Sequence, residues 1–252
     1  MGLFTPKELE YDPGVRQTGF NRYKQLLSLY GGDWFKLNLL TTLGALPLAT
    51  GMALGMATSS VAVLIPTCLA GGAIFGPFLA GLFDGILRGM RDDAGNWWEN
   101  YKKSWRQNGK GSLLPGALTG LFAGAYLFMA LLLYWANTGP SLGTIALYLF
   151  SGLLFFAVTI LWWAQFVLLD LRAEDRMRNL ILFASKYLWR VTGAALLQLL
   201  WWGLIALFAP WTLLLVPFLG FWYSIFVSLR RIYDPLNEEF RVEARLFPDR
   251  EG

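Results

Sequence analysis

Three long stretches of this chain carry no charged side chain, and they constrain its fold more than any other feature. They run from Leu37 to Phe83, from Gly111 to Leu169 and from Val191 to Leu229, and hold 47, 59 and 39 residues. A membrane-spanning helix needs about 20 apolar residues, so each stretch has room for two. One charge at a helix centre costs about 2.5–3.5 kcal/mol on insertion. The sequence therefore predicts an all-α, polytopic membrane protein.

Each stretch has a break near its middle. Residues 55–60 are small and polar, residues 137–141 read Asn-Thr-Gly-Pro-Ser, and Pro210 interrupts the third stretch. We therefore expect six transmembrane helices, over residues 37–56, 63–88, 113–136, 142–169, 190–208 and 211–229. They form one membrane domain over 34–229, between an N-terminal segment of 1–33 and a C-terminal tail of 230–252.

Composition agrees with lipid exposure and narrows the possible chemistry. Hydrophobic residues make up 56% of the chain and charged residues 15%, against about 25% charged in an average soluble protein. Histidine is absent and Cys68 is the only cysteine, which excludes disulfides and argues against zinc sites and His- or Cys-based nucleophiles. We expect no metal, no cofactor, no enzymatic activity and no nucleic-acid partner.

Basic residues predict the orientation. All 21 lysines and arginines lie in four segments: 1–36, 84–110, 170–190 and 230–252. The three intervening loops contain none. Because lysine and arginine in short loops stay on the cytoplasmic side, all four segments belong there. The sequence predicts a multi-pass protein of the cell membrane with both termini in the cytoplasm.

Two charged segments have the pattern of helices lying on the membrane surface. Residues 20–30 alternate apolar and polar positions at helical spacing, and Gly31-Gly32 is expected to end that helix before Asp33 caps the first span. In the second segment Asn96 precedes Glu99 by three residues, as in a capping box.

The helix that Asn96 begins is expected to have an aromatic face and a basic one. Its aromatic residues share one side and its cations lie elsewhere on the turn, which is typical of a helix in the headgroup layer of anionic lipid. A docking surface for a cytoplasmic partner is the alternative. The residues concerned are Trp97, Trp98, Tyr101 and Trp105 on the first face, and Lys102, Lys103 and Arg106 on the second.

Glycines recur at four-residue spacing in the second and third spans. Such ladders let two helix backbones approach closely. We expect the two ladders to meet each other, and a homodimer contact is the alternative. The second span carries Gly81, Gly85 and Gly89, with Gly72 and Gly76 upstream, and the third span carries Gly116, Gly120 and Gly124.

Asp84 and Arg88 are the only oppositely charged residues that the second span places four residues apart. This spacing and order favour an ion pair on a helix. Ionisable residues in a membrane are candidates for gating or binding, but the position of the pair at the end of the span favours a structural role.

Three sequence segments carry a family resemblance: Phe35-Lys-Leu-Asn-Leu-Leu40 with Leu46-Pro47, Gly76-Pro-Phe-Leu-Ala-Gly-Leu-Phe-Asp-Gly-Ile-Leu-Arg88, and Trp97-Trp-Glu-Asn-Tyr-Lys-Lys-Ser-Trp-Arg-Gln-Asn108. In these segments the chain resembles the YesL-like family of bacterial integral membrane proteins. The similarity extends over about residues 30–235 and departs from the common pattern in a longer Gly/Ala-rich stretch over 51–71. The resemblance implies an accessory role beside carbohydrate-uptake systems, and it carries over no catalytic residue.

Two functional hypotheses follow. The first is a non-enzymatic membrane protein, accessory to a transport or sensing complex, with a transporter or sensor subunit as partner. The second is a small-solute permease. A permease requires a polar cavity in the middle of the membrane, whereas an accessory protein requires a packed interior and a lateral surface for its partner.

Overall fold

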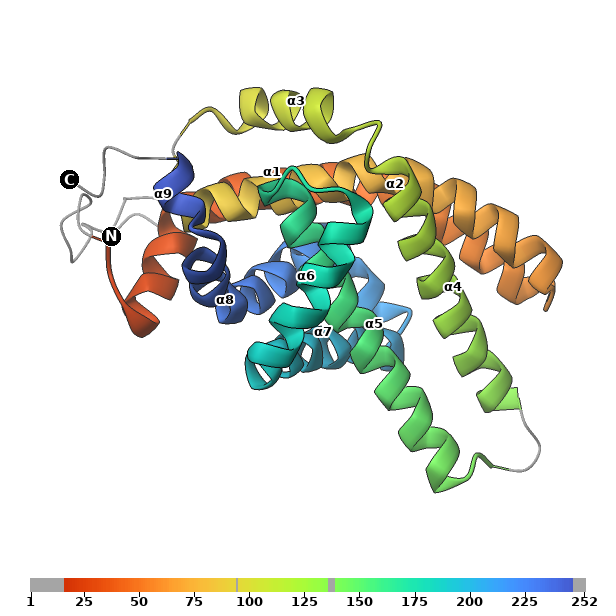
Figure 1. The fold of residues 1–252 in the computed structure, drawn as a ribbon. Coiled ribbons are helices and arrows are strands. Elements are labelled where there is room, and N and C mark those ends of the chain that lie inside the picture. Colours follow the sequence, from red (N-terminus) through yellow and green to blue (C-terminus); the bar gives the residue numbers. More distant parts are fainter. Residues whose placement is uncertain (1–15, 94, 136–138, 247–252) are drawn as a thin grey trace, which may run out of the picture.

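The computed structural model describes residues 16–93, 95–135 and 139–246. Helix is the only regular structure within these residues, which confirms the predicted all-α fold (Figure 1). The elements are α1 (Gly19–Ala57), α2 (Val61–Met90), α3 (Trp97–Asn108), α4 (Leu113–Trp135), α5 (Leu142–Leu168), α6 (Ala173–Lys186), α7 (Leu188–Leu207), a 3₁₀ turn η1 (Trp211–Leu215), a π turn η2 (Val216–Gly220), α8 (Phe221–Phe240) and α9 (Val242–Leu246).

Six helical segments are long and apolar enough to cross a membrane, as predicted. They are α1, α2, α4, α5, α7 and the continuous run from Trp211 to Phe240. They form three consecutive hairpins. The first hairpin packs closely along its length, α4 lies against α2, and α5 lies against α7. Figure 1 shows α3 lying alongside the first hairpin. Helix α6 connects α5 to α7, and these two helices also contact each other directly.

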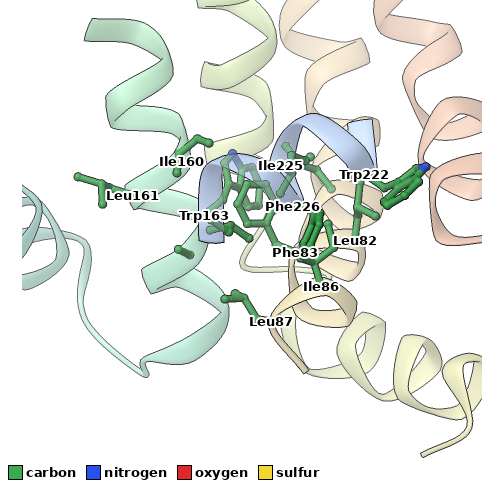
Figure 2. Close-up of a cluster of buried hydrophobic side chains, with 14 of the residues drawn as sticks. Leu82, Phe83, Ile86, Leu87, Ile160, Leu161, Trp163, Trp222, Ile225 and Phe226 are labelled. Carbon is green, nitrogen blue, oxygen red and sulfur yellow. The ribbon is translucent and has the colours of Figure 1, made fainter. Parts of the chain in front are cut away.

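The core lies where α2, α5 and α8 meet (Figure 2). Residues three or four apart on each helix present one apolar face to this centre. The indole of Trp163, fully buried, donates a hydrogen bond from Nε1 to Thr119 Oγ1 on α4 at 3.2 Å. The core residues labelled in Figure 2 are Leu82, Phe83, Ile86, Leu87, Ile160, Leu161, Trp163, Trp222, Ile225 and Phe226.

Helix α1 corrects the expected break at Gly31-Gly32. It runs through both glycines without interruption and begins at Gly19 rather than near residue 37. Each glycine costs a helix about 1 kcal/mol relative to alanine, but buried Trp34 and Leu37 pack just beyond them and stabilise the continuous helix. At 1.5 Å per residue its 39 residues extend about 58 Å. That is nearly twice the roughly 30 Å hydrocarbon thickness, so one end of α1 extends beyond it.

Two further segments differ from the prediction. Helix α8 continues past the expected boundary at residue 229 to Phe240, and Ile232 and Leu236 are fully buried there. The segment 170–190, for which we expected no helix, forms α6 with Leu180 and Phe183 buried. Both segments are amphipathic. Because charged residues occur along them, a search for long uncharged stretches does not detect their apolar faces.

Candidate functional site

A cleft opens between α1, α2 and the start of α3. Its volume is about 140 Å³. Aromatic side chains form much of its wall: Tyr30 and Trp34 from α1, and Trp97 and Tyr101 from α3. Charged groups of Asp33, Asp84, Arg88 and Asp93 also line it. The cleft therefore combines aromatic rings with charged side chains in one wall.

The predicted glycine ladder of α2 forms part of this cleft. A Cβ atom on Gly81 would collide with the Tyr101 ring, and one on Gly85 with the Leu37 side chain. A Cβ on Gly89 would lie 2.7 Å from Cζ2 of Trp34. The ladder therefore lets side chains of α1 and α3 lie directly on the α2 backbone.

This placement corrects the expected contact between the two ladders. The glycines of α4 meet α2 nearer its N-terminal end, at Gly72 and Gly76. A Cβ on Gly116 would lie 2.5 Å from the Gly72 carbonyl oxygen, and one on Gly124 would collide with Cys68 Sγ. Both helices are thus the expected neighbours, but Gly81, Gly85 and Gly89 face α1 and α3 instead of Gly116, Gly120 and Gly124.

Asp84 and Arg88 form an ion pair, and they belong to a larger cluster. Arg88 Nε donates to Asp84 Oδ2 at 2.9 Å, and Arg88 Nη1 donates to Asp93 Oδ2 at 2.6 Å. Arg91 lies 3.3 Å from Asp93 and 3.8 Å from Asp84. The Asp84 and Arg91 side chains are almost completely buried. Two carboxylates and two guanidinium groups balance one another, as burial of charge requires.

A second group of ion pairs joins the first and last described segments. Arg16 donates to Glu243 at 2.7 Å, and the hydroxyl of Tyr233 donates to the same carboxylate at 2.7 Å. Arg22 donates to Asp92 at 2.7 Å and to the Met90 carbonyl at 3.0 Å. Sequence analysis missed this group because its members are up to 227 positions apart.

The Glu243 carboxylate is held in its charged form. Burial by itself would raise its pKa, but hydrogen bonds from Arg16 and Tyr233 outweigh burial and keep the pKa below its ordinary value of 4.5. A depressed pKa stabilises the fold at pH values above the ordinary pKa, and this stability is lost as the pH falls from the ordinary pKa through the lowered pKa of the folded state.

We expect Glu243→Gln to lower the melting temperature in detergent by about 1–3 °C at pH 7, because the Arg16 pair is partly exposed. The difference from wild type should begin to shrink below the ordinary pKa of 4.5 and should vanish below the lowered pKa of the folded state, since protonated glutamate and glutamine carry the same charge. Glu238→Gln, on the exposed side of α8, is the control. A difference that persists unchanged at pH 3.5 would contradict this assignment.

Helix α3 begins as predicted. Asn96 Oδ1 accepts hydrogen bonds from the backbone N–H groups of Trp98 at 2.9 Å and Glu99 at 3.3 Å. These bonds satisfy two of the donors that a helix start leaves unpaired.

The aromatic face of α3 points toward the protein more than expected. Tyr101 is buried against α2, and burial raises the pKa of its hydroxyl to about 12. Trp105 packs edge-on against Phe78 of α2, with ring centroids 5.2 Å apart. Trp98 and Trp105 keep 45% and 40% of their surface exposed, so only part of this face can contact lipid. Lys102, Lys103 and Arg106 are all exposed, as the basic face requires.

Sequence reasoning gave no role to Asn38, whose side chain makes four hydrogen bonds in the structure. Asn38 is fully buried in α1. Its Nδ2 donates to the carbonyls of Val216 at 2.9 Å and Pro217 at 2.7 Å. Its Oδ1 accepts from the N–H groups of Phe221 and Trp222, both at 3.0 Å. The amide therefore uses both of its donors and both of its acceptor positions.

These four bonds hold the last span together where it is interrupted. Pro217 has no N–H and cannot continue a regular helix ladder, and the chain passes there from the π turn η2 into α8. Asn38 bonds to two carbonyls and two N–H groups of this junction. The indoles of Trp222 and Trp201 donate to the Phe218 and Gly220 carbonyls at 2.8 and 2.9 Å. The sequence offered only two signals for this joint, an asparagine within one uncharged stretch and a proline within another.

Comparisons with protein-family models, with curated proteins and with solved structures find no match to this chain.

Proposed function

We propose that this chain is a non-enzymatic, multi-pass protein of the cell membrane and an accessory subunit of a transport or sensing complex. The confinement of lysine and arginine to four segments supports an orientation with both termini in the cytoplasm. The α1–α2–α3 cleft and the basic face of α3 then lie on the cytoplasmic side. Carbohydrate uptake as the process rests on the resemblance to the YesL-like family.

The α4–α5 hairpin is the observation that carries the proposal. Its two helices contact each other less than those of the other hairpins, because α4 packs on α2 and α5 on α7. Their clearest contact is the stacked pair of Tyr126 and Tyr148, with ring centroids 4.2 Å apart. Large apolar side chains elsewhere on the hairpin are exposed, including Tyr134, Leu142 and Leu147. Such a hairpin offers apolar surface on both helices to lipid or to the spans of another protein.

A small-solute permease is the second candidate, and the interrupted last span favours it. Broken helices line the substrate sites of many transporters, where the freed backbone groups face the solute. Here the carbonyls of Pro217, Phe218 and Gly220 accept hydrogen bonds from Asn38, Trp222 and Trp201. Backbone groups that are bonded within the protein do not bind a solute. This arrangement therefore favours the accessory role over the permease.

A photo-crosslinking residue in place of Leu147 tests the proposal in intact cells. Leu147 is 69% exposed on α5, so we expect an adduct with a subunit of a membrane transporter or sensor. The same residue in place of Leu161, which is 1% exposed, should give no such adduct. Adducts with lipid alone at position 147, together with solute uptake by the purified protein in vesicles, would favour the permease.

A further inference from the structure

We propose that the cleft between α1, α2 and α3 binds a small ammonium ion, either an alkylamine or a quaternary ammonium group. The inference goes beyond an accessory role and does not depend on it. Aromatic ring faces attract cations within about 6 Å of the ring centroid. Trp34 and Trp97 bring indoles to the cleft, Tyr30 and Tyr101 bring phenol rings, and the Asp33 carboxylate lies beside them.

The chain already places an ammonium group against this site. Lys36 Nζ lies 5.2 Å from the Trp97 ring centroid and 2.8 Å from Asp33 Oδ1. Both Trp97 and Asp33 line the cleft. A ring face and a carboxylate around one ammonium are the two contacts by which proteins recognise organic cations. The Lys36 side chain, 48% exposed, can leave these contacts for water at little cost.

The charge of the cleft favours a cation over an anion. Three carboxylates line it, from Asp33, Asp84 and Asp93, against the single guanidinium of Arg88. Asp84 and Asp93 are bound by Arg88 and Arg91, whereas Asp33 is paired with the exposed Lys36. An external ammonium that takes the place of Lys36 leaves the charge balance of the site unchanged. An anion in the place of the Lys36 ammonium would instead lie beside the Asp33 carboxylate and be repelled by it.

The size of the cleft limits the ligand. A volume of about 140 Å³ is well below the roughly 300–1,000 Å³ of pockets for drug-sized molecules. It suits a group such as choline or ethanolamine. The same chemistry occurs in free amines and in the headgroups of phosphatidylcholine and phosphatidylethanolamine, so the source of the ligand is a separate question.

Saturation-transfer NMR with choline tests the site, using the full chain in nanodiscs of phosphatidylglycerol, a lipid without an ammonium group. We expect saturable binding to the wild type. Asp33→Asn should weaken it about tenfold by removing the carboxylate. Lys36→Ala should tighten it about threefold, because the internal competitor is gone. Lys24→Ala, which removes an ammonium over Phe20 outside the cleft lining, should leave the affinity unchanged.

The opposite signs of the two main variants separate binding from misfolding, since a damaged fold does not tighten binding. Repeating the titration with phosphatidylethanolamine in the nanodiscs identifies the source. A weaker apparent choline affinity supports a lipid headgroup in the cleft, and an unchanged one supports a free amine. Absence of saturable binding in both wild type and Lys36→Ala overturns the proposal, as does a loss of affinity on Lys36→Ala equal to that of Asp33→Asn.

Discussion

Replacing Asn38 with leucine is expected to lower the melting temperature in detergent by about 10 °C, which corresponds to about 3 kcal/mol or more. Leucine has the same number and branching of side-chain heavy atoms as asparagine but no polar atom. It would leave the carbonyls of Val216 and Pro217 and the N–H groups of Phe221 and Trp222 without these partners. A buried group that loses its partner costs about 1–3 kcal/mol, and local rearrangement of η2 recovers only part of this.

Two further variants make the Asn38 result specific. Asn38→Asp keeps the acceptor for Phe221 and Trp222 but turns a second oxygen toward two carbonyls, so it should also destabilise the fold. Leu39→Ala, at the adjacent and exposed position of the same helix, should have little effect. If Asn38→Leu melts within 2 °C of the wild type, the interrupted span is held by other contacts.

Replacing Gly120 with alanine is expected to destabilise the protein by about 1–3 kcal/mol, although alanine normally stabilises a helix. The new Cβ would lie 2.7 Å from both the Cys68 carbonyl oxygen and the Gly72 Cα atom. Both neighbours are backbone atoms and cannot move aside without separating α2 from α4. Thermal melting in detergent, followed by circular dichroism at 222 nm, measures the effect.

Two glycines elsewhere serve as controls for Gly120. A Cβ on Gly203 of α7 would meet nothing within 4 Å, so Gly203→Ala should be neutral or stabilising through helix propensity. Gly85→Ala would meet only side-chain atoms of Leu37, which can change rotamer, so its cost should be smaller than that of Gly120→Ala. Equal effects at all three positions would mean that backbone proximity does not determine the outcome.

The sequence predicts the number and approximate ends of the spans because the positions of the charged residues, the lengths of the uncharged stretches and the breaks within them decide both. A charged residue is expensive in hydrocarbon wherever it lies, so no knowledge of tertiary contacts is needed. The same argument fails at Gly31 and beyond residue 229. At these places α1 and α8 continue beyond the uncharged stretches. Their ends depend on packing, by residues such as Trp34 in α1 and Ile232 in α8.

The candidate site was only partly predictable for a related reason. Helical periodicity shows that Gly81, Gly85 and Gly89 share a face, but it does not show which helix that face meets. Because one loop joins α2 to α4, we expected α4 to contact this glycine face. The residues that do contact it are Trp34 and Leu37 of α1 and Tyr101 of α3. The local features, namely the Asn96 cap and the Asp84–Arg88 pair, involve neighbouring turns and were accessible to sequence reasoning.

The bonds of Asn38 also bear on the order in which the structure assembles during synthesis. Its most distant partner, Trp222, follows it by 184 positions. At about 5–20 residues per second, synthesis of that segment takes roughly 10–40 s. Throughout this interval the primary amide of Asn38 lacks its partners in η2 and α8. The close packing of α1 on α2 can form at once, whereas the satisfaction of this amide waits for the last hairpin to arrive. The final insertion event thus completes the first helix as well as the last.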